Sequence, residues 1–316
     1  MSVAHIRPLT KSRIRRPIKP SDRVKKSHAE SRSDVSTGSV KTQSTEYALA
    51  TGEAATYRLK VLHDVYGSGT RRVLRDAGLR RGMRVADIGC GPGMVTAMLA
   101  EIVGPEGDVV GVDLSGAQIA QARSRIRNGA RNIDFVEASA VDTGLPRESF
   151  DLVYCRFLLM HLPEPERALA EMLALLKPNG ILVCEDGELT SAGSEPPSAL
   201  VAFSDLWGLL GAQRGIDYDL GRRLYQMVLA AGFTMPKIVF NQPLAVEGEN
   251  KRLLELSVAE AGPTFVNAGL ITATELDSTL AEMRRANENS SIVAVMPRMT
   301  QVWARKPALR PLWAVS

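Results

Sequence analysis

The sequence predicts an α/β fold with a doubly wound, mostly parallel sheet. Two observations support this prediction. Short apolar segments alternate with amphipathic ones from residue 53 onward, and a glycine-rich turn follows the first of the apolar segments. The chain has 316 residues, of which 45% are hydrophobic, so it is long enough to cover both faces of such a sheet with helices.

The expected elements follow one another in a regular order. Residues 53–66 place Leu59, Leu62 and Tyr66 on one helical face, and a second short helix is expected over residues 70–79. The S-x-x-Q pattern that begins at Ser115 is typical of a helix start. The expected strands cover residues 84–88, 108–113, 132–138, 149–155 and 181–186, and the helices between them cover 94–103, 115–127 and 165–176.

The repeated order of strand and helix predicts crossover connections, which make successive strands parallel. In such a sheet the ligand binds at the carboxyl ends of the strands, where the strand order reverses. The turn after residue 88 leaves the first strand at that place. It is therefore the first candidate for a binding site.

Residues 85–93 read VADIGCGPG, an apolar strand that delivers a carboxylate into a glycine-rich turn. Gly89, Gly91 and Gly93 have the spacing G-x-G-x-G, and Met94 occupies the place of the third glycine of the dinucleotide fingerprint G-x-G-x-x-G. At about 4 Å, Asp87 would repel a pyrophosphate charge by roughly 4 kcal/mol at an effective dielectric constant near 20. An ammonium group and a sulfonium ion would be attracted instead, and S-adenosylmethionine carries both.

This stretch resembles the first motif of class I S-adenosylmethionine-dependent methyltransferases of the small-molecule type, and the segments up to residue 186 keep that family's order. The resemblance covers residues 47–186. It implies a Rossmann-like, seven-stranded sheet with its last strand antiparallel, a helical lid, and S-adenosyl-L-methionine as the cofactor.

The resemblance also implies contacts for individual residues. The glycine loop, with Cys90, would pack against the methionine part of the cofactor while Asp87 orients its amino group. Asp113, at the end of the second strand, would bind both ribose hydroxyls, and Leu114 would flank the adenine. Ser139 stands where the family often has an aspartate that contacts the adenine, and Ala140 would lie beside it. Cys155 and Arg156, at the end of the fourth strand, would lie beside the cofactor. Arg58 would pair with the cofactor carboxylate, and Tyr47 would close over the cofactor.

Methyl transfer from a sulfonium is an in-line displacement, so the protein must align the reactants and exclude water. If the nucleophile is a phenol, a hydroxyl or an enol, a base adds about 10²–10⁴-fold to the rate. We expect His161, Glu185 or Asp186 to be that base, because all three lie at the edge where the strand ends converge. Each also has a structural interpretation, as a packed histidine or as a strand-end carboxylate.

The chain is expected to divide into three parts. Residues 1–45 hold eleven Lys/Arg and three Asp/Glu and show little apolar periodicity, so we expect a disordered basic tail. Residues 46–190 would form the cofactor-binding core, and residues 191–316 would add the last strands and an inserted helical lid. In that last part we expect helices over 196–213, 221–233 and 250–288, strands over 235–246 and 291–306, and Phe203, Leu206 and Trp207 as core or pocket lining.

Charge and composition limit the partners. The tail has a net charge of +8, which leaves about −4 for the rest of the chain. No apolar run approaches the roughly 20 residues that span a bilayer. The three cysteines form no CxxC pair, and no His/Cys cluster has zinc-like spacing. We therefore expect a cytoplasmic protein that needs no metal or membrane and takes a small-molecule acceptor; a homodimer stays open.

Three other functions deserve comparison. A nucleic-acid methyltransferase could use the basic tail for phosphate contacts. The body is slightly acidic, however, and the Asn/Asp-Pro-Pro-Tyr/Phe motif for methylating base amines is missing after the fourth strand, so we expect no nucleic acid. A non-catalytic protein that keeps the cofactor site as a scaffold stays open. An NAD(P) oxidoreductase is disfavoured by the glycine spacing and by Asp87.

Overall fold

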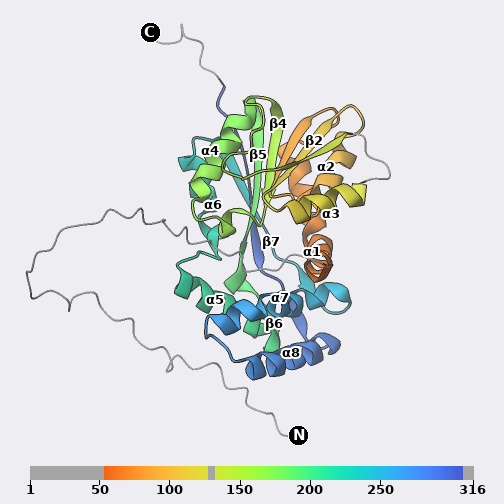
Figure 1. The fold of residues 1–316 in the computed structure, drawn as a ribbon, viewed down its shortest axis with the longest axis vertical. Coiled ribbons are helices and arrows are strands. Elements are labelled where there is room, and N and C mark those ends of the chain that lie inside the picture. The colour runs from red at the N-terminus through yellow and green to blue at the C-terminus, as the bar shows by residue number, and fades with distance from the viewer. Residues whose placement is uncertain (1–52, 127–131, 309–316) are drawn as a thin grey trace, which may run out of the picture. The chain divides into compact units, whose positions relative to one another are not determined.

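The structure is a computed structural model that describes residues 53–126 and 132–308 (Figure 1). The predicted basic tail and Tyr47 lie outside these residues. The large sheet has seven strands in the order β3-β2-β1-β4-β5-β10-β7. Its strands are β1 (Arg84–Ile88), β2 (Asp108–Asp113), β3 (Ile133–Glu137), β4 (Phe150–Arg156), β5 (Leu176–Glu188), β7 (Thr234–Asn241) and β10 (Arg298–Arg305).

The strand directions confirm the predicted fold class. Within the group β1 to β5, every strand pair is parallel. Strand β10 is antiparallel to both of its neighbours, β5 and β7. Strands β2 and β3 follow β1 on one side of it in the sheet. The next two strands of the chain, β4 and β5, lie on the other side of β1. The strand order therefore reverses between β1 and β4, where a ligand site is expected.

Helices cover both faces of the sheet, with α2 and α3 on one side and α4 and α6 on the other (Figure 1). Side chains alternate along the buried strands: Leu152 and Tyr154 of β4 join a core with α1 and α2, whereas Val153 and Cys155 join a second core with α4. The helices are α1 (Glu53–Ala77), α2 (Met94–Val103), α3 (Gly116–Ile126), α4 (Pro165–Leu175) and α6 (Leu224–Ala230).

The first helix differs from expectation. The sequence predicted two short helices, but α1 continues through Gly67 and Gly69 as one helix. A Cβ at Gly69 would overlap the side-chain amide of Asn241 in β7, so the glycine permits a close approach of the helix to the sheet. Gly69 therefore serves packing inside a continuous helix.

The last predicted strand is also different. Residues 291–306 form two strands, β9 (Val293–Val295) and β10, which belong to different sheets. Pro297 lies between them and cannot donate to a strand ladder. Its carbonyl accepts a hydrogen bond from Tyr66 Oη in α1 at 2.7 Å, which fixes the crossing point.

A lid of helices and a small sheet lies beyond the carboxyl end of β5 (Figure 1). The small sheet has the order β6-β9-β8, and all its pairs are antiparallel. The lid elements are η3 (Leu189–Ser191), β6 (Gly193–Glu195), η4 (Ala199–Val201), α5 (Ala202–Arg214), β8 (Leu244–Ala245), η6 (Glu249–Arg252), α7 (Leu253–Asn267), α8 (Ala273–Glu288) and β9. In the part of the chain that the structure describes, no helix is long and apolar enough to cross a membrane.

Candidate active site

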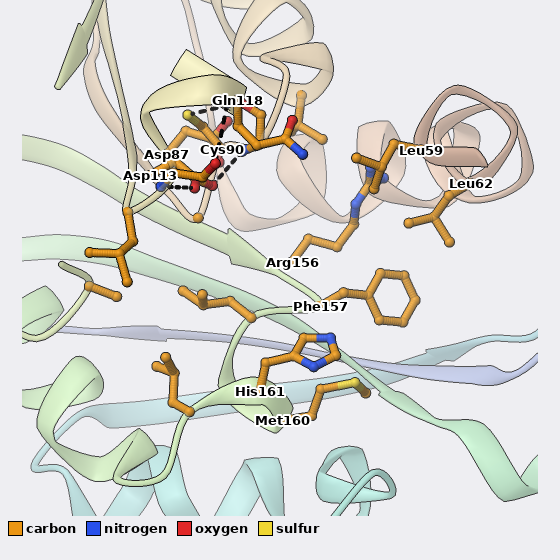
Figure 2. A pocket seen from close by; sticks show the side chains of 18 of the residues that line it. Leu59, Leu62, Asp87, Cys90, Asp113, Gln118, Arg156, Phe157, Met160 and His161 are labelled. Atoms are coloured by element: carbon orange, nitrogen blue, oxygen red, sulfur yellow. Dashed lines mark hydrogen bonds between the residues drawn. The ribbon is translucent and has the colours of Figure 1, made fainter. Parts of the chain in front are cut away.

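A cavity of about 710 Å³ lies between the strand ends and the lid. Figure 2 shows its two sides: Asp87, Cys90, Asp113 and Gln118 on one, and His161 with its neighbours on the other. The first side comes from β1, β2 and their following turns. The second comes from the short helix η2 (Leu159–His161), which follows β4. The cavity therefore opens at the predicted reversal of strand order.

The glycine turn needs glycine for its backbone. Gly89, Gly91 and Gly93 have φ values of 73°, 52° and 77°, a region that side chains with a Cβ rarely adopt. A Cβ at Gly89 would also lie 2.8 Å from Leu158 Cδ1. Gly89, Cys90 and Gly91 line the cavity, whereas Gly93 begins α2 behind it. The turn thus offers a bare backbone surface to a ligand.

Asp87 is buried at the end of β1 and lines the cavity. Its Oδ2 accepts a hydrogen bond from Thr96 Oγ1 at 2.6 Å. Burial raises the pKa of Asp87 to about 6, although the Thr96 hydrogen bond and the Arg156 charge oppose this shift. A positively charged ligand group beside Asp87 would therefore be strongly favoured, because it would compensate a buried carboxylate.

Asp113, at the end of β2, is held in place by the backbone. Its Oδ2 accepts the Gly91 N–H at 2.8 Å and its Oδ1 accepts the Ser115 N–H at 2.9 Å. Both oxygens keep further lone pairs for a ligand in the cavity. Leu114, the next residue, is 74% exposed and lines the cavity, as a side chain that flanks a planar ring would.

Gln118 lines the cavity, whereas its sequence pattern indicates only a role at the start of a helix. Its N–H does donate to Ser115 Oγ, at 3.4 Å, but its side chain does not bond back to the helix start. The side chain lines the cavity close to Asp113, and its Oε1 is buried with no hydrogen-bond partner among the described residues (Figure 2). The S-x-x-Q spacing correctly predicted that Gln118 lies in the first turn of a helix. It gave no sign that the side chain of Gln118 also lines the cavity.

Strands β3 and β4 supply the next contacts. Ser139 and Ala140 line the cavity, as does Arg156, whose Nη1 donates to Thr70 Oγ1 at 3.2 Å. Cys155 does not line it: its Sγ lies 3.3 Å from Cys184 Sγ, inside the core on the opposite face. Alternation along β4 explains this, since adjacent residues of a strand point to opposite faces.

Arg58 lines the cavity but already has a partner. Its Nε donates to Glu260 Oε2 of α7 at 2.7 Å, and both side chains are buried. Glu260 Oε1 is buried without a hydrogen-bond partner among the described residues. This ion pair joins α1 to the lid, a contact that the sequence resemblance did not anticipate.

His161 faces the cavity from η2, and its ring makes an edge contact with Tyr218 at a centroid distance of 6.2 Å. Burial, with a smaller contribution from the Arg58 charge, lowers the pKa of His161 to about 4. The imidazole is therefore neutral at pH 7, and the lowered pKa makes it a weaker base than a free imidazole.

Glu185 and Asp186 do not line the cavity. Glu185 is buried and accepts hydrogen bonds from Tyr154, Gln301 and Thr70. Asp186 is also buried: its Oδ2 accepts the N–H groups of Leu159 and Met160, and its Oδ1 accepts that of Gly187. Burial raises the pKa of both carboxyls. Through its hydrogen bonds to Leu159 and Met160, Asp186 holds the η2 turn that carries His161.

No group of three or more His, Cys, Asp or Glu side chains is placed to bind a metal ion within residues 53–126 and 132–308.

Comparison with known proteins gives a consistent result. A family model described as a methyltransferase domain matches residues 86–184. The chain is 37% identical, over 147 residues, to the ubiquinone/menaquinone biosynthesis C-methyltransferase UbiE of Pseudomonas fluorescens. That match covers 44% of this chain and 57% of the relative. A demethylmenaquinone methyltransferase of Staphylococcus aureus is 35% identical over 114 residues, which are 36% of this chain and 47% of the relative.

The chain therefore spans about half the length of these curated relatives. Among solved structures, a putative methyltransferase of Bacillus halodurans is similar with a TM-score of 0.51 and 21% identity, over 76% of this chain and all of that chain. A phosphoethanolamine N-methyltransferase 2 of Haemonchus contortus gives 0.52 and 16%, over 79% and 57%. At these identities the structures support the fold. Residues 86–184 thus match the model of a methyltransferase domain, in agreement with the family resemblance seen in the sequence.

Proposed function

We propose that this protein transfers a methyl group from S-adenosylmethionine to an oxygen, nitrogen or carbon atom of a small molecule. The observation that carries the proposal is the pair of strand-end carboxylates, Asp87 and Asp113, around a glycine turn that lines the cavity. The curated relatives are named as methyltransferases that act in quinone biosynthesis, which supports a small-molecule acceptor.

The residues present fit this cofactor. Asp87 would hold its ammonium group, the glycine turn would accept its methionine backbone, and Asp113 would accept hydrogen bonds from its ribose hydroxyls. The amide of Gln118 adds what Asp113 lacks, since a carboxylate only accepts hydrogen bonds whereas an amide also donates them. Its unpartnered Oε1 is the kind of buried polar atom that a ligand completes.

Arg156 is the better candidate for the cofactor's carboxylate. Arg58, to which the resemblance assigned this role, is engaged by Glu260. Arg156 lines the same cavity and has a neutral side chain, Thr70, as its hydrogen-bond partner. Arg156 makes no salt bridge with a described residue, so an incoming carboxylate can bond to it without displacing another carboxylate.

When bound, S-adenosylmethionine supplies an electrophilic methyl group. The chain's own part is to hold the acceptor in line, to exclude water and, for a hydroxyl acceptor, to take a proton. His161 is the candidate base, because it faces the chamber and is neutral. Asp186 acts on it as a positioning residue through the backbone of η2.

Calorimetry tests the cofactor directly. S-adenosylhomocysteine should bind the full chain, and NADH should not. Tight binding of NADH without binding of S-adenosylhomocysteine would refute the proposal. Release of S-adenosylhomocysteine from S-adenosylmethionine in the presence of an acceptor then separates an enzyme from a non-catalytic scaffold.

The affinity for S-adenosylhomocysteine should depend on pH through Asp87. The ligand's ammonium group needs an ionised carboxylate, and the pKa of Asp87 is about 6 in the free protein. Binding should therefore be constant above about pH 7 and weaken by up to about tenfold per unit as the pH falls below 6. Calorimetry between pH 5 and 8 measures this. Asp87→Asn should bind weakly with a flat profile, and an equally steep profile in that variant would contradict the assignment.

Replacing His161 by alanine should lower turnover by about 10²–10⁴-fold for a hydroxyl acceptor, because the base is lost. The affinity for S-adenosylhomocysteine should stay the same, since His161 lies on the opposite side of the cavity from Asp87 and Asp113 (Figure 2). Initial rates at saturating cofactor and calorimetry on the same sample give the two numbers. Unchanged turnover would remove His161 from the mechanism.

A further inference from the structure

The acid groups of the cavity are distributed unevenly. Among the described residues that line it, the acids are Asp87, Asp113 and Glu164. The first two lie at the strand ends, and Glu164 lies at the N-terminus of α4, where its side chain is 61% exposed and paired with Arg167. Among the described residues, the lid elements therefore contribute no carboxylate to the cavity wall.

The wall under the lid is mostly apolar. Phe203 and Trp207 come from α5, Leu253 and Leu254 from the start of α7, and Leu189 from η3. Phe203, Leu206 and Trp207 were expected as core or lining: Phe203 and Trp207 serve as both, whereas Leu206 is core alone. A molecule that fills this space must leave water and gains little from carrying a charge.

Arg58, a basic residue that lines the cavity, adds little net attraction for an anion and still opposes a cation. The charge of Arg58 is offset by Glu260 at 2.7 Å, and Glu260 does not line the cavity. The Arg58 charge still acts on the chamber, because it contributes to the lowered pKa of His161. An ammonium group placed beside His161 would meet the Arg58 guanidinium, and the nearby lining acid in the sequence, Glu164, is already paired with Arg167.

His161 is a polar feature of this wall that can select a functional group. Its turn is fixed by the two N–H groups that donate to Asp186, at 2.9 Å from Leu159 and 3.3 Å from Met160, and its ring lies against Tyr218. A neutral imidazole accepts a hydrogen bond from a hydroxyl. Resting on the proposed methyltransferase function, we propose that the lid chamber binds an uncharged, mostly apolar acceptor whose hydroxyl group hydrogen-bonds to His161.

Three matched probes test the proposal on the full chain saturated with S-adenosylhomocysteine at pH 7. They are 2-naphthol, 2-naphthylmethylammonium and 2-naphthoate, and calorimetry gives their dissociation constants. The naphthol should bind at least about tenfold more tightly than either ion, because each ion would be desolvated without a partner of opposite charge. His161→Phe, which keeps a ring and removes the acceptor, should weaken naphthol about fivefold to tenfold.

Glu166→Gln is the control variant, since Glu166 lies in the exposed first turn of α4 and does not line the cavity. It should bind all three probes as the parent protein does. Binding of either ion as tightly as the naphthol would overturn the proposal, and so would failure of all three probes or an unchanged naphthol affinity in His161→Phe. If S-adenosylhomocysteine itself fails to bind, the proposed function falls instead.

Discussion

Replacing Asp113 by alanine is expected to weaken the binding of S-adenosylhomocysteine by at least about a hundredfold. The variant loses two hydrogen bonds from ribose hydroxyls to a charged acceptor, each worth about 1.5–3 kcal/mol. It also removes the side chain that accepts the N–H groups of Gly91 and Ser115, so the glycine turn loses its anchor. Calorimetry at pH 7 measures the change.

Asp113→Asn separates the two causes. The amide keeps one acceptor oxygen and most of the shape, so the loss should be smaller than for alanine. Gln118→Leu should weaken binding further in the same direction, because the amide that complements Asp113 is lost. If Asp113→Ala binds the ligand as the parent does, while Asp87→Asn does not, then Asp113 is a structural residue of the turn and the ribose assignment is wrong.

Replacing Glu260 by alanine should lower the free energy of unfolding by about 3–5 kcal/mol. The side chains of Arg58 and Glu260 are only 7% and 5% exposed, so removal of the carboxylate strands a guanidinium in a site that water reaches poorly. Chemical denaturation followed by circular dichroism gives the value. The lid should also open to proteolysis first, because this pair joins α7 to α1.

The exposed pair Lys60–Asp64 on the same helix α1 is the matched control. Its side chains are 61% and 42% exposed, and Asp64→Ala should cost at most about 1 kcal/mol. The double variant Arg58→Met, Glu260→Leu should recover much of the loss, since an apolar pair removes the stranded charge. Equal losses in Glu260→Ala and Asp64→Ala would show that the buried pair does not hold the lid.

Local sequence was sufficient for the cofactor side of the site. Asp87 and the three glycines lie within seven residues, and Asp113 follows after one strand–helix–strand unit. The backbone there is determined by short-range rules: positive φ at the glycines, and a carboxylate at each strand end. These features were predicted because the residues that form them are close together in the chain.

The lid side depends on pairs that are far apart in sequence. Arg58 and Glu260 are separated by 202 positions, and nothing near Arg58 reveals its partner. The carboxylates of Glu185 and Asp186 looked equivalent in sequence, yet one binds three side chains and the other binds three backbone N–H groups. Neither reaches the cavity, because the tertiary neighbours of β5 enclose both.

The small sheet β6-β9-β8 has a consequence for protein engineering. Its strands come from residues 193–195, 293–295 and 244–245, so three stretches that are distant in sequence pair with one another in this sheet. A graft that imports β6 together with α5 from a relative would pair the imported β6 with the host's β9, whose sequence does not match it. An attempt to alter the acceptor preference should therefore exchange all three stretches at the same time and keep the glycine turn of residues 89–93 unchanged.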